Sequence, residues 1–191
     1  MSSPEQILAF WFGDPTAPTY GKPRKIWFRK DPRFDAEIRR RFESDYQQAA
    51  AGRLQAWRHT AYSCLALLLL LDQMPRNMYR QTPQAYATDP LALEVAQYAV
   101  AQGFDQIILP VQRWFVYLPF EHSEDLEQQG RAVDLFNQLQ DQPDCHEAID
   151  SAHKHLQVIQ RFGRFPHRNA ILGRPSTPEE ESYLRQAGSR F

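Results

Sequence analysis

A run of fourteen residues near the carboxyl end of the chain, residues 161–174, gathers side chains suited to binding anions. It holds four arginines, a histidine and an asparagine but no acidic residue: Arg161, Arg164, His167, Arg168, Asn169 and Arg174. Guanidinium groups this close together repel one another unless anions neutralise them. The run therefore predicts that carboxylates of the protein, or an anionic ligand, hold these arginines.

Two sources of negative charge fit this arginine-rich run. One is internal, because the acidic stretch 121–127 can pair with it through arginine–carboxylate forks. The other is a small ligand, a carboxylate or a phosphate, bound in a pocket that the run lines. Arginine in place of lysine throughout favours bidentate recognition of such groups. Both interpretations remain open, and different arginines can serve in each.

Asp72 is a second candidate for chemistry. It directly follows a run of leucines, so its carboxylate is expected to lie against a poorly hydrated wall. Arg76 follows four residues later, which is the spacing of an ion pair within one helix. The simpler interpretation is a structural salt bridge at a helix end. The functional interpretation makes Asp72 a catalytic group and Arg76 a ligand clamp.

Two histidines could move protons near neutral pH. His122 precedes Ser123, the expected N-cap of a following helix, and that cap leaves the histidine unexplained. His155 lies at the edge of an apolar helical stripe and could equally be a structural histidine. Both adjoin helix ends, so we expect the two rings to meet at one site. Their spacing from His167 matches no zinc motif, and no metal is predicted.

The elements that must position these side chains are predicted to be helices. Apolar residues recur every three or four positions over residues 34–49 and 148–162, as on amphipathic helices. Further helices are expected at about residues 90–102 and 123–140, and residues 114–120 as a short buried helix or an extended connector. A polar cap followed by proline marks five helix starts: Ser3-Pro4, Asp31-Pro32, Thr82-Pro83, Asp89-Pro90 and Thr177-Pro178.

Composition and charge exclude some classes of binding partner for this chain. Its 191 residues carry a net charge of −1, so no global field draws it to nucleic acid or to an anionic membrane. The apolar stretch 61–71 is only eleven residues long, whereas a membrane span needs about 20, and it is predicted to be buried core. Two distant cysteines and an amino-terminal segment without signal-peptide features predict a cytoplasmic protein.

Motifs along the chain, among them Leu71–Asn77, His122–Asp125 and Arg161–Arg174, make it resemble a bacterial family, domain-of-unknown-function family 924. Met74 stands where that family usually has phenylalanine, and Gln81 where glycine is common. The resemblance implies a tetratricopeptide-like all-helical fold and a candidate residue set, but no activity. It spans nearly the whole chain and lies in Ile7–Gly13, Trp27–Phe28, Leu71–Asn77, Arg80, Thr82-Pro83, Ala87–Asp89, His122–Asp125, His155, Arg161–Arg174 and Ser176–Thr177.

The sequence thus predicts one all-α domain over residues 1–191, built of antiparallel helical hairpins. The leading functional hypothesis is a pocket for a small anionic ligand, and the alternative is a tetratricopeptide-like scaffold for a protein partner. No cofactor is predicted, because no phosphate-binding loop, nucleophile elbow or Cys–His signature is present. The catalytic candidates are His122, His155 and Asp72, and the ligand-binding candidates are Arg76, Arg161, Arg164, His167, Arg168 and Asn169.

Overall fold

The computed structural model describes residues 1–189, and within them all regular structure is helical. Short 3-10 turns and one π-helical turn, Leu69–Gln73, connect the helices. The all-α prediction is confirmed. The α-helices are α1 (Pro4–Phe12), α2 (Pro32–Ala50), α3 (Ala61–Leu68), α4 (Met74–Met78), α5 (Asp89–Ala101), α6 (Pro110–Glu121), α7 (Leu126–Asn137), α8 (His146–Phe162) and α9 (Pro178–Leu184).

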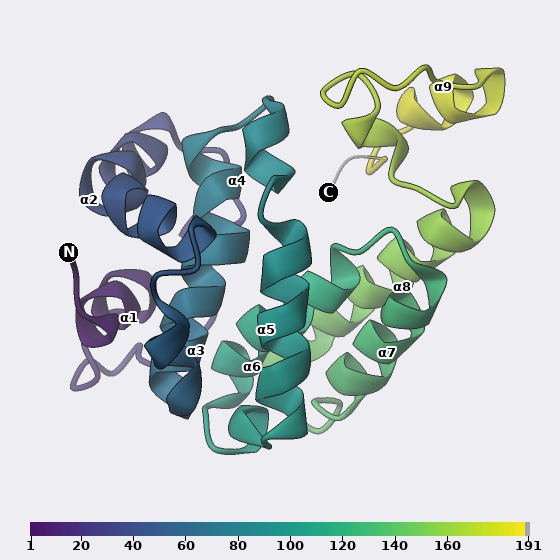
Figure 1. The fold of residues 1–191 in the computed structure, drawn as a ribbon. Coiled ribbons are helices and arrows are strands. Elements are labelled where there is room, and N and C mark those ends of the chain that lie inside the picture. Colours follow the sequence, from purple (N-terminus) through teal and green to yellow (C-terminus); the bar gives the residue numbers. More distant parts are fainter. Residues whose placement is uncertain (190–191) are drawn as a thin grey trace.

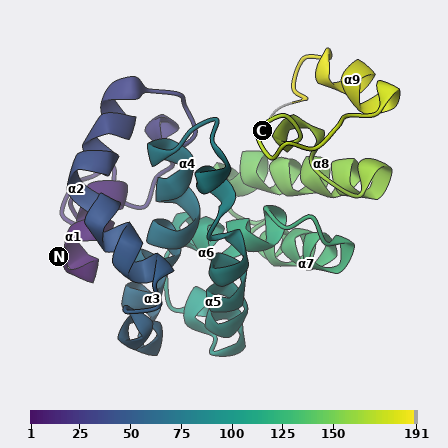
Figure 2. The same ribbon diagram turned by 45° about the horizontal axis from the view of Figure 1, so that its top comes forward.

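The helices follow one another across the molecule in nearly the order of the chain (Figures 1 and 2). Helices α1 and α2 lie on one side of α3 and α4, while α7 and α8 lie on the other side, beyond α5 and α6. Consecutive helices pack on each other from α5 through α8, and α3 contacts α1, α5 and α6. Helix α9 lies at the far end, past the carboxyl end of α8.

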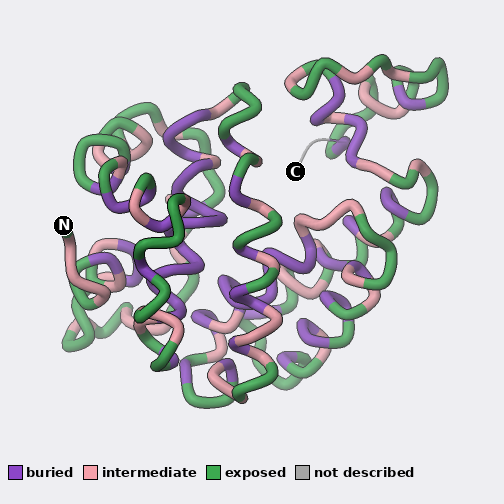
Figure 3. The backbone as a smooth tube through the Cα atoms, viewed as in Figure 1, coloured by how far each residue is buried: buried purple, intermediate pink, exposed green. Residues whose placement is uncertain are grey.

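Burial follows this arrangement (Figure 3). One apolar core extends from Ile7 in α1 to Ala152 in α8, and a small second cluster joins the end of α8 to Phe165. The stretch 61–71 lies in the main core, with only Tyr62 and Ser63 partly or fully exposed. None of the helices within residues 1–189 is long and apolar enough to cross a membrane.

Helix starts follow the proline signals, with two corrections. Ser3, Asp31 and Thr177 cap α1, α2 and α9 as expected. Thr82-Pro83 begins only a 3-10 turn, and α5 begins at Asp89 itself, after Thr88.

Ser123 is not the cap of α7, which is shorter at both ends than the expected helix. Asp125 takes that role by accepting a hydrogen bond from the Gln128 N–H, whereas the Ser123 hydroxyl accepts one from the Asp125 N–H and the Ser123 carbonyl one from the Gln129 side chain. Residues 114–120 belong to the regular helix α6, so the extended alternative for that segment is wrong.

A π-helical turn joins α3 to α4 and contains Asp72. Pro75 has no N–H to offer the carbonyl oxygen of Leu71, four residues earlier, as an ordinary helix would require. That oxygen instead accepts a hydrogen bond from the Thr88 hydroxyl at 2.6 Å. Turns of this kind, with one residue inserted into a helix, occur often at functional sites. Here the inserted turn contains Asp72.

Gly163 ends α8 in the left-handed conformation, with φ of 66°. A Cβ at this position would meet no atom within 4 Å, so the cost of a side chain is confined to the backbone. We expect Gly163→Ala to lower the free energy of unfolding by about 1–2 kcal/mol in chemical denaturation.

Gly130→Ala is the matched control, because Gly130 lies inside α7 and also has open space around its Cβ position. There alanine should raise stability by about 0.5–1 kcal/mol, since it favours the helix. Equal effects of the two variants would contradict the conformational argument. The same left-handed conformation occurs at Gln81, with φ of 61°, where the family commonly has glycine.

Candidate functional site

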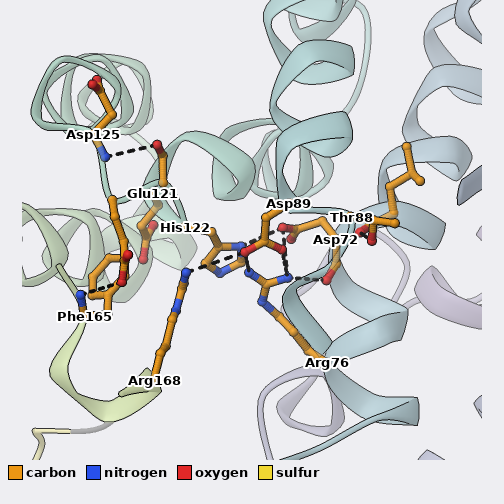
Figure 4. Close-up of polar contacts among 12 residues, drawn as sticks. Asp72, Arg76, Thr88, Asp89, Glu121, His122, Asp125, Phe165 and Arg168 are labelled. Carbon is orange, nitrogen blue, oxygen red and sulfur yellow. Dashed lines mark hydrogen bonds and ion pairs between the residues drawn. The ribbon is translucent and has the colours of Figure 1, made fainter. Parts of the chain in front are cut away.

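Four segments of the chain meet at one polar cluster (Figure 4). They are the π turn with α4, the amino end of α5, the carboxyl end of α6, and the arginine-rich run 161–174. Arg76 and Arg168 approach Asp89 from different segments, with His122 beside them. The site therefore depends on the tertiary fold and not on one local motif.

Asp72 is a buried carboxylate that stays ionised. Its Oδ1 lies 2.7 Å from His122 Nδ1 and 3.3 Å from an Arg76 nitrogen, and Gln73 donates a hydrogen bond to Oδ2. Burial alone would raise the pKa of Asp72, but the charge of Arg76 and the hydrogen bonds from His122 and Gln73 outweigh burial and lower it. The predicted ion pair within the helix is thus present, together with a histidine contact.

His122 is held in one tautomer by this carboxylate. Burial, and next the charge of Arg76, lower the pKa of His122 below its usual value. Because an ionised Asp72 can only accept, Nδ1 must carry the hydrogen and donate it. Nε2 then keeps its lone pair, and no group in residues 1–189 forms a hydrogen bond with it. His122 can therefore accept a proton at Nε2, as a general base does.

A second histidine–carboxylate pair lies next to the first. His155 Nδ1 is 2.8 Å from Glu121 Oε1, which also accepts a hydrogen bond from the Ser151 hydroxyl. The ring centres of His122 and His155 are 6.4 Å apart. The prediction that these two histidines converge is confirmed. They do so because the end of α6 packs against the middle of α8.

Arg168 differs from the other arginines of the cluster. It is 6% exposed, and its guanidinium carbon lies 4.7 Å from the ring centre of Tyr86 and 4.5 Å from that of Phe165. Within residues 1–189 its one ionic contact is to Asp89 at 3.6 Å, and its side chain forms no hydrogen bond there. Burial, and next the charge of Arg76, lower the pKa of Arg168 to about 10.

Arg76, in contrast, donates hydrogen bonds to both Asp89 and Asp72. Its two terminal nitrogens donate to the two oxygens of Asp89 at 2.8 and 2.9 Å, and one also donates to the carbonyl of Asp72. Although burial acts against its charge, the carboxylates of Asp72 and Asp89 raise its pKa above the usual value. Asp89 is therefore satisfied mainly by Arg76, and Arg168 keeps donors for another acceptor.

The remaining candidates of the run 161–174 are divided between other partners. Arg161 pairs with Glu179, and Arg164 forms a two-pronged bond with Glu180, both on α9. Asn169 is buried and bonds to Ser176 and Arg174. His167 lies near Arg168, and burial followed by that charge lowers its pKa to about 3.

The two charged segments also contact each other, as predicted. Arg174 donates to both oxygens of Glu124 at 2.6 and 2.9 Å, and Glu124 accepts a further bond from the Phe165 N–H. This pairing fastens the turn that carries Arg168. The stretch 121–127 thus holds Arg174, whereas α9 holds Arg161 and Arg164.

Comparison with known proteins assigns the chain to a family. A family model described as a bacterial protein of unknown function, DUF924, matches residues 7–188. The chain belongs to this family. A solved structure, titled as a protein of unknown function from Agrobacterium tumefaciens, is 43% identical, and the match covers 95% of this chain and 96% of that one with a TM-score of 0.83. No curated protein matches the chain.

Several residues of this DUF924 site were not expected from the sequence. Asp89 was interpreted only as a helix cap, although it lies in the Ala87–Asp89 motif of the family. Tyr86 packs against both Arg76 and Arg168, and no pattern pointed to it. Glu121 and Ser151 contact each other and His155. Of these two residues, the sequence pointed only to Glu121, because it directly precedes His122.

Proposed function

We propose that this DUF924 protein binds a small carboxylate or phosphate through Arg168. The observation that supports the proposal is a buried guanidinium, stacked between two aromatic rings, that has no hydrogen bond within residues 1–189. Buried charged groups in proteins are normally paired and hydrogen-bonded, because an unmet donor costs free energy. The oxygens of a planar or tetrahedral anion would supply the missing acceptors in a bidentate geometry.

The groups around Arg168 suit a ligand that gains or loses a proton. The His122 side chain is 13% exposed, and those of Arg76 and Asp89 are 19% and 17% exposed, so solvent reaches the edge of the cluster. Asp72 fixes the His122 ring through Nδ1, which leaves Nε2 as a proton acceptor. In this proposal Arg168 and Arg76 orient the anion, His122 exchanges a proton with it, and His155 lies beside His122.

A thermal-shift series with a matched pair of arginine variants tests this proposal. The probes are inorganic phosphate, acetate, citrate and a nucleoside monophosphate, each titrated against the wild type. A bound anion at 100 times its dissociation constant should stabilise the protein by about 2.7 kcal/mol. Arg168→Lys should lose most of this gain, since it keeps the charge but loses the fork and the stacking.

Arg161→Gln is the control for this experiment. It removes one positive charge from the same run, but Arg161 and its partner Glu179 are half or more exposed and lie outside the cluster. It should therefore keep the full stabilisation by the anion. Equal losses in both variants would place the anion elsewhere. If no anion stabilises the wild type, the binding proposal is wrong and the scaffold alternative is favoured.

A further inference from the structure

A groove of about 550 Å³ is lined by none of Arg76, Asp89, His122 and Arg168. Its walls are largely apolar and come from four parts of the chain: Phe28 after the 3-10 turn Lys25–Trp27, Trp114 and Leu118 on α6, Phe136 on α7, and Ala148 on α8. Phe28 is 59% exposed, which is unusual for a large aromatic side chain. Volume and lining are those of a site for a small organic molecule.

One lining residue of this groove is an incompletely paired carboxylate. Glu121 lines the groove, yet its side chain is only 1% exposed. Oε1 accepts a hydrogen bond from the Ser151 hydroxyl and lies 2.8 Å from His155 Nδ1, but Oε2 is buried and has no hydrogen-bond partner within residues 1–189. A buried carboxylate oxygen without a donor is costly. A ligand that donates a hydrogen bond to Glu121 Oε2 would remove this cost and so bind more tightly.

The rim of the groove does not add a charge preference of its own. Arg24, Lys25, Asp144 and Glu147 line the groove, two charges of each sign, and Asp144 is also paired with Lys22 at 2.8 Å. The Arg24 guanidinium is further engaged by the carbonyls of Phe10 and Trp11. Selection between charged and neutral ligands therefore depends on Glu121.

We propose that this groove binds a small amphipathic amine, whose apolar or aromatic body lies between Phe28 and Trp114 and whose amino group donates to Glu121 Oε2. An ammonium group supplies both the missing hydrogen bond and a charge opposite to the carboxylate. The aromatic walls bury the body of the molecule. This site is separate from the anion site at Arg168, although Glu121 and His122 are adjacent in the chain.

Calorimetric titration of the full chain with three matched probes tests the proposal. The probes are 2-phenylethylamine, 2-phenylethanol and 3-phenylpropionate, which share a body and differ in the terminal group. The amine should bind at least ten times more tightly than the alcohol, and the carboxylate should not bind. Equal affinity for amine and alcohol, or no binding of the amine, would overturn the assignment.

Three variants locate the bound amine. Glu121→Gln keeps the size of the side chain and should weaken the amine at least ten-fold, whereas Glu147→Gln at the rim should change affinity less than two-fold. Equal losses in these two would place the amine at the rim and overturn the proposal. Because Glu121 is buried and its variant can fail to fold, Ala148→Trp fills the groove from the partly exposed face of α8. Full amine affinity in that variant would also refute the site.

Discussion

Replacing Asp72 with asparagine is expected to lower the free energy of unfolding by about 3–5 kcal/mol, the usual cost of breaking a buried ion pair by removing one partner. The substitution keeps the volume of the side chain, so packing around it is preserved and the loss reports on charge and hydrogen bonding. The new side chain would place an amide where Arg76, His122 and Gln73 now approach a carboxylate. Chemical denaturation at pH 7 measures the effect.

Asp134→Asn is the control for the Asp72 variant. Asp134 is exposed on α7, and surface substitutions away from special contacts usually change stability by less than about 0.5 kcal/mol. If Asp72→Asn were as harmless as this control, the buried cluster would contribute nothing to the fold. Asp72 would then be retained for another reason, and its role as a structural anchor of His122 would be refuted.

The second large effect is a loss of stability in mild acid. The pKa of His167 is about 3 in the folded protein and about 6.5 when the chain is unfolded, and that of His122 is also lowered. Between these values the unfolded state binds a proton that the folded state excludes. Stability is therefore highest above pH 6.5 and falls by up to about 1.4 kcal/mol per pH unit for each such histidine as the pH decreases.

Measuring the free energy of unfolding from pH 7.5 to 4.5 isolates this contribution. Carboxylates with lowered pKa values, such as Glu180 at about 2 through its bond to Arg164, lose their stabilising effect below this range. His167→Gln should flatten the slope, whatever its stability at pH 7. His59→Gln alters an exposed histidine and should leave the slope unchanged. A slope in His167→Gln equal to that of the wild type would contradict the assignment.

The sequence allowed much of the fold to be predicted, because helix caps and apolar spacing are local signals. The proline-marked start of α9 and the burial of residues 61–71 are examples. The cap of α7 is Asp125 and not Ser123, whose hydroxyl accepts a hydrogen bond from the Asp125 N–H while its carbonyl accepts one from the buried side chain of Gln129. Two adjacent polar residues can each serve as a cap, and the sequence alone did not distinguish them.

The candidate site was predictable in its residue types but not in its pairing. His122 and His155 converge as expected, but they do so because the carboxyl end of α6 packs against the middle of α8, and not because two helix ends meet. Which carboxylate each arginine contacts depends on the path of the chain after Gly163, and that path brings Arg164 to Glu180. The incomplete pairing of Arg168 could not be inferred, since it depends on Tyr86 from a distant turn.

The hydrogen bond between the Thr88 hydroxyl and the Leu71 carbonyl links two distant positions of the chain. Proline at position 75 creates the acceptor, and the hydroxyl at position 88 uses it while fixing the residue just before Asp89. Restoring an N–H at position 75 would give that carbonyl a competing donor and release the start of α5. The two positions thus form an epistatic pair: the effect of a substitution at either depends on the residue at the other, and the position of the acid that holds Arg76 depends on both.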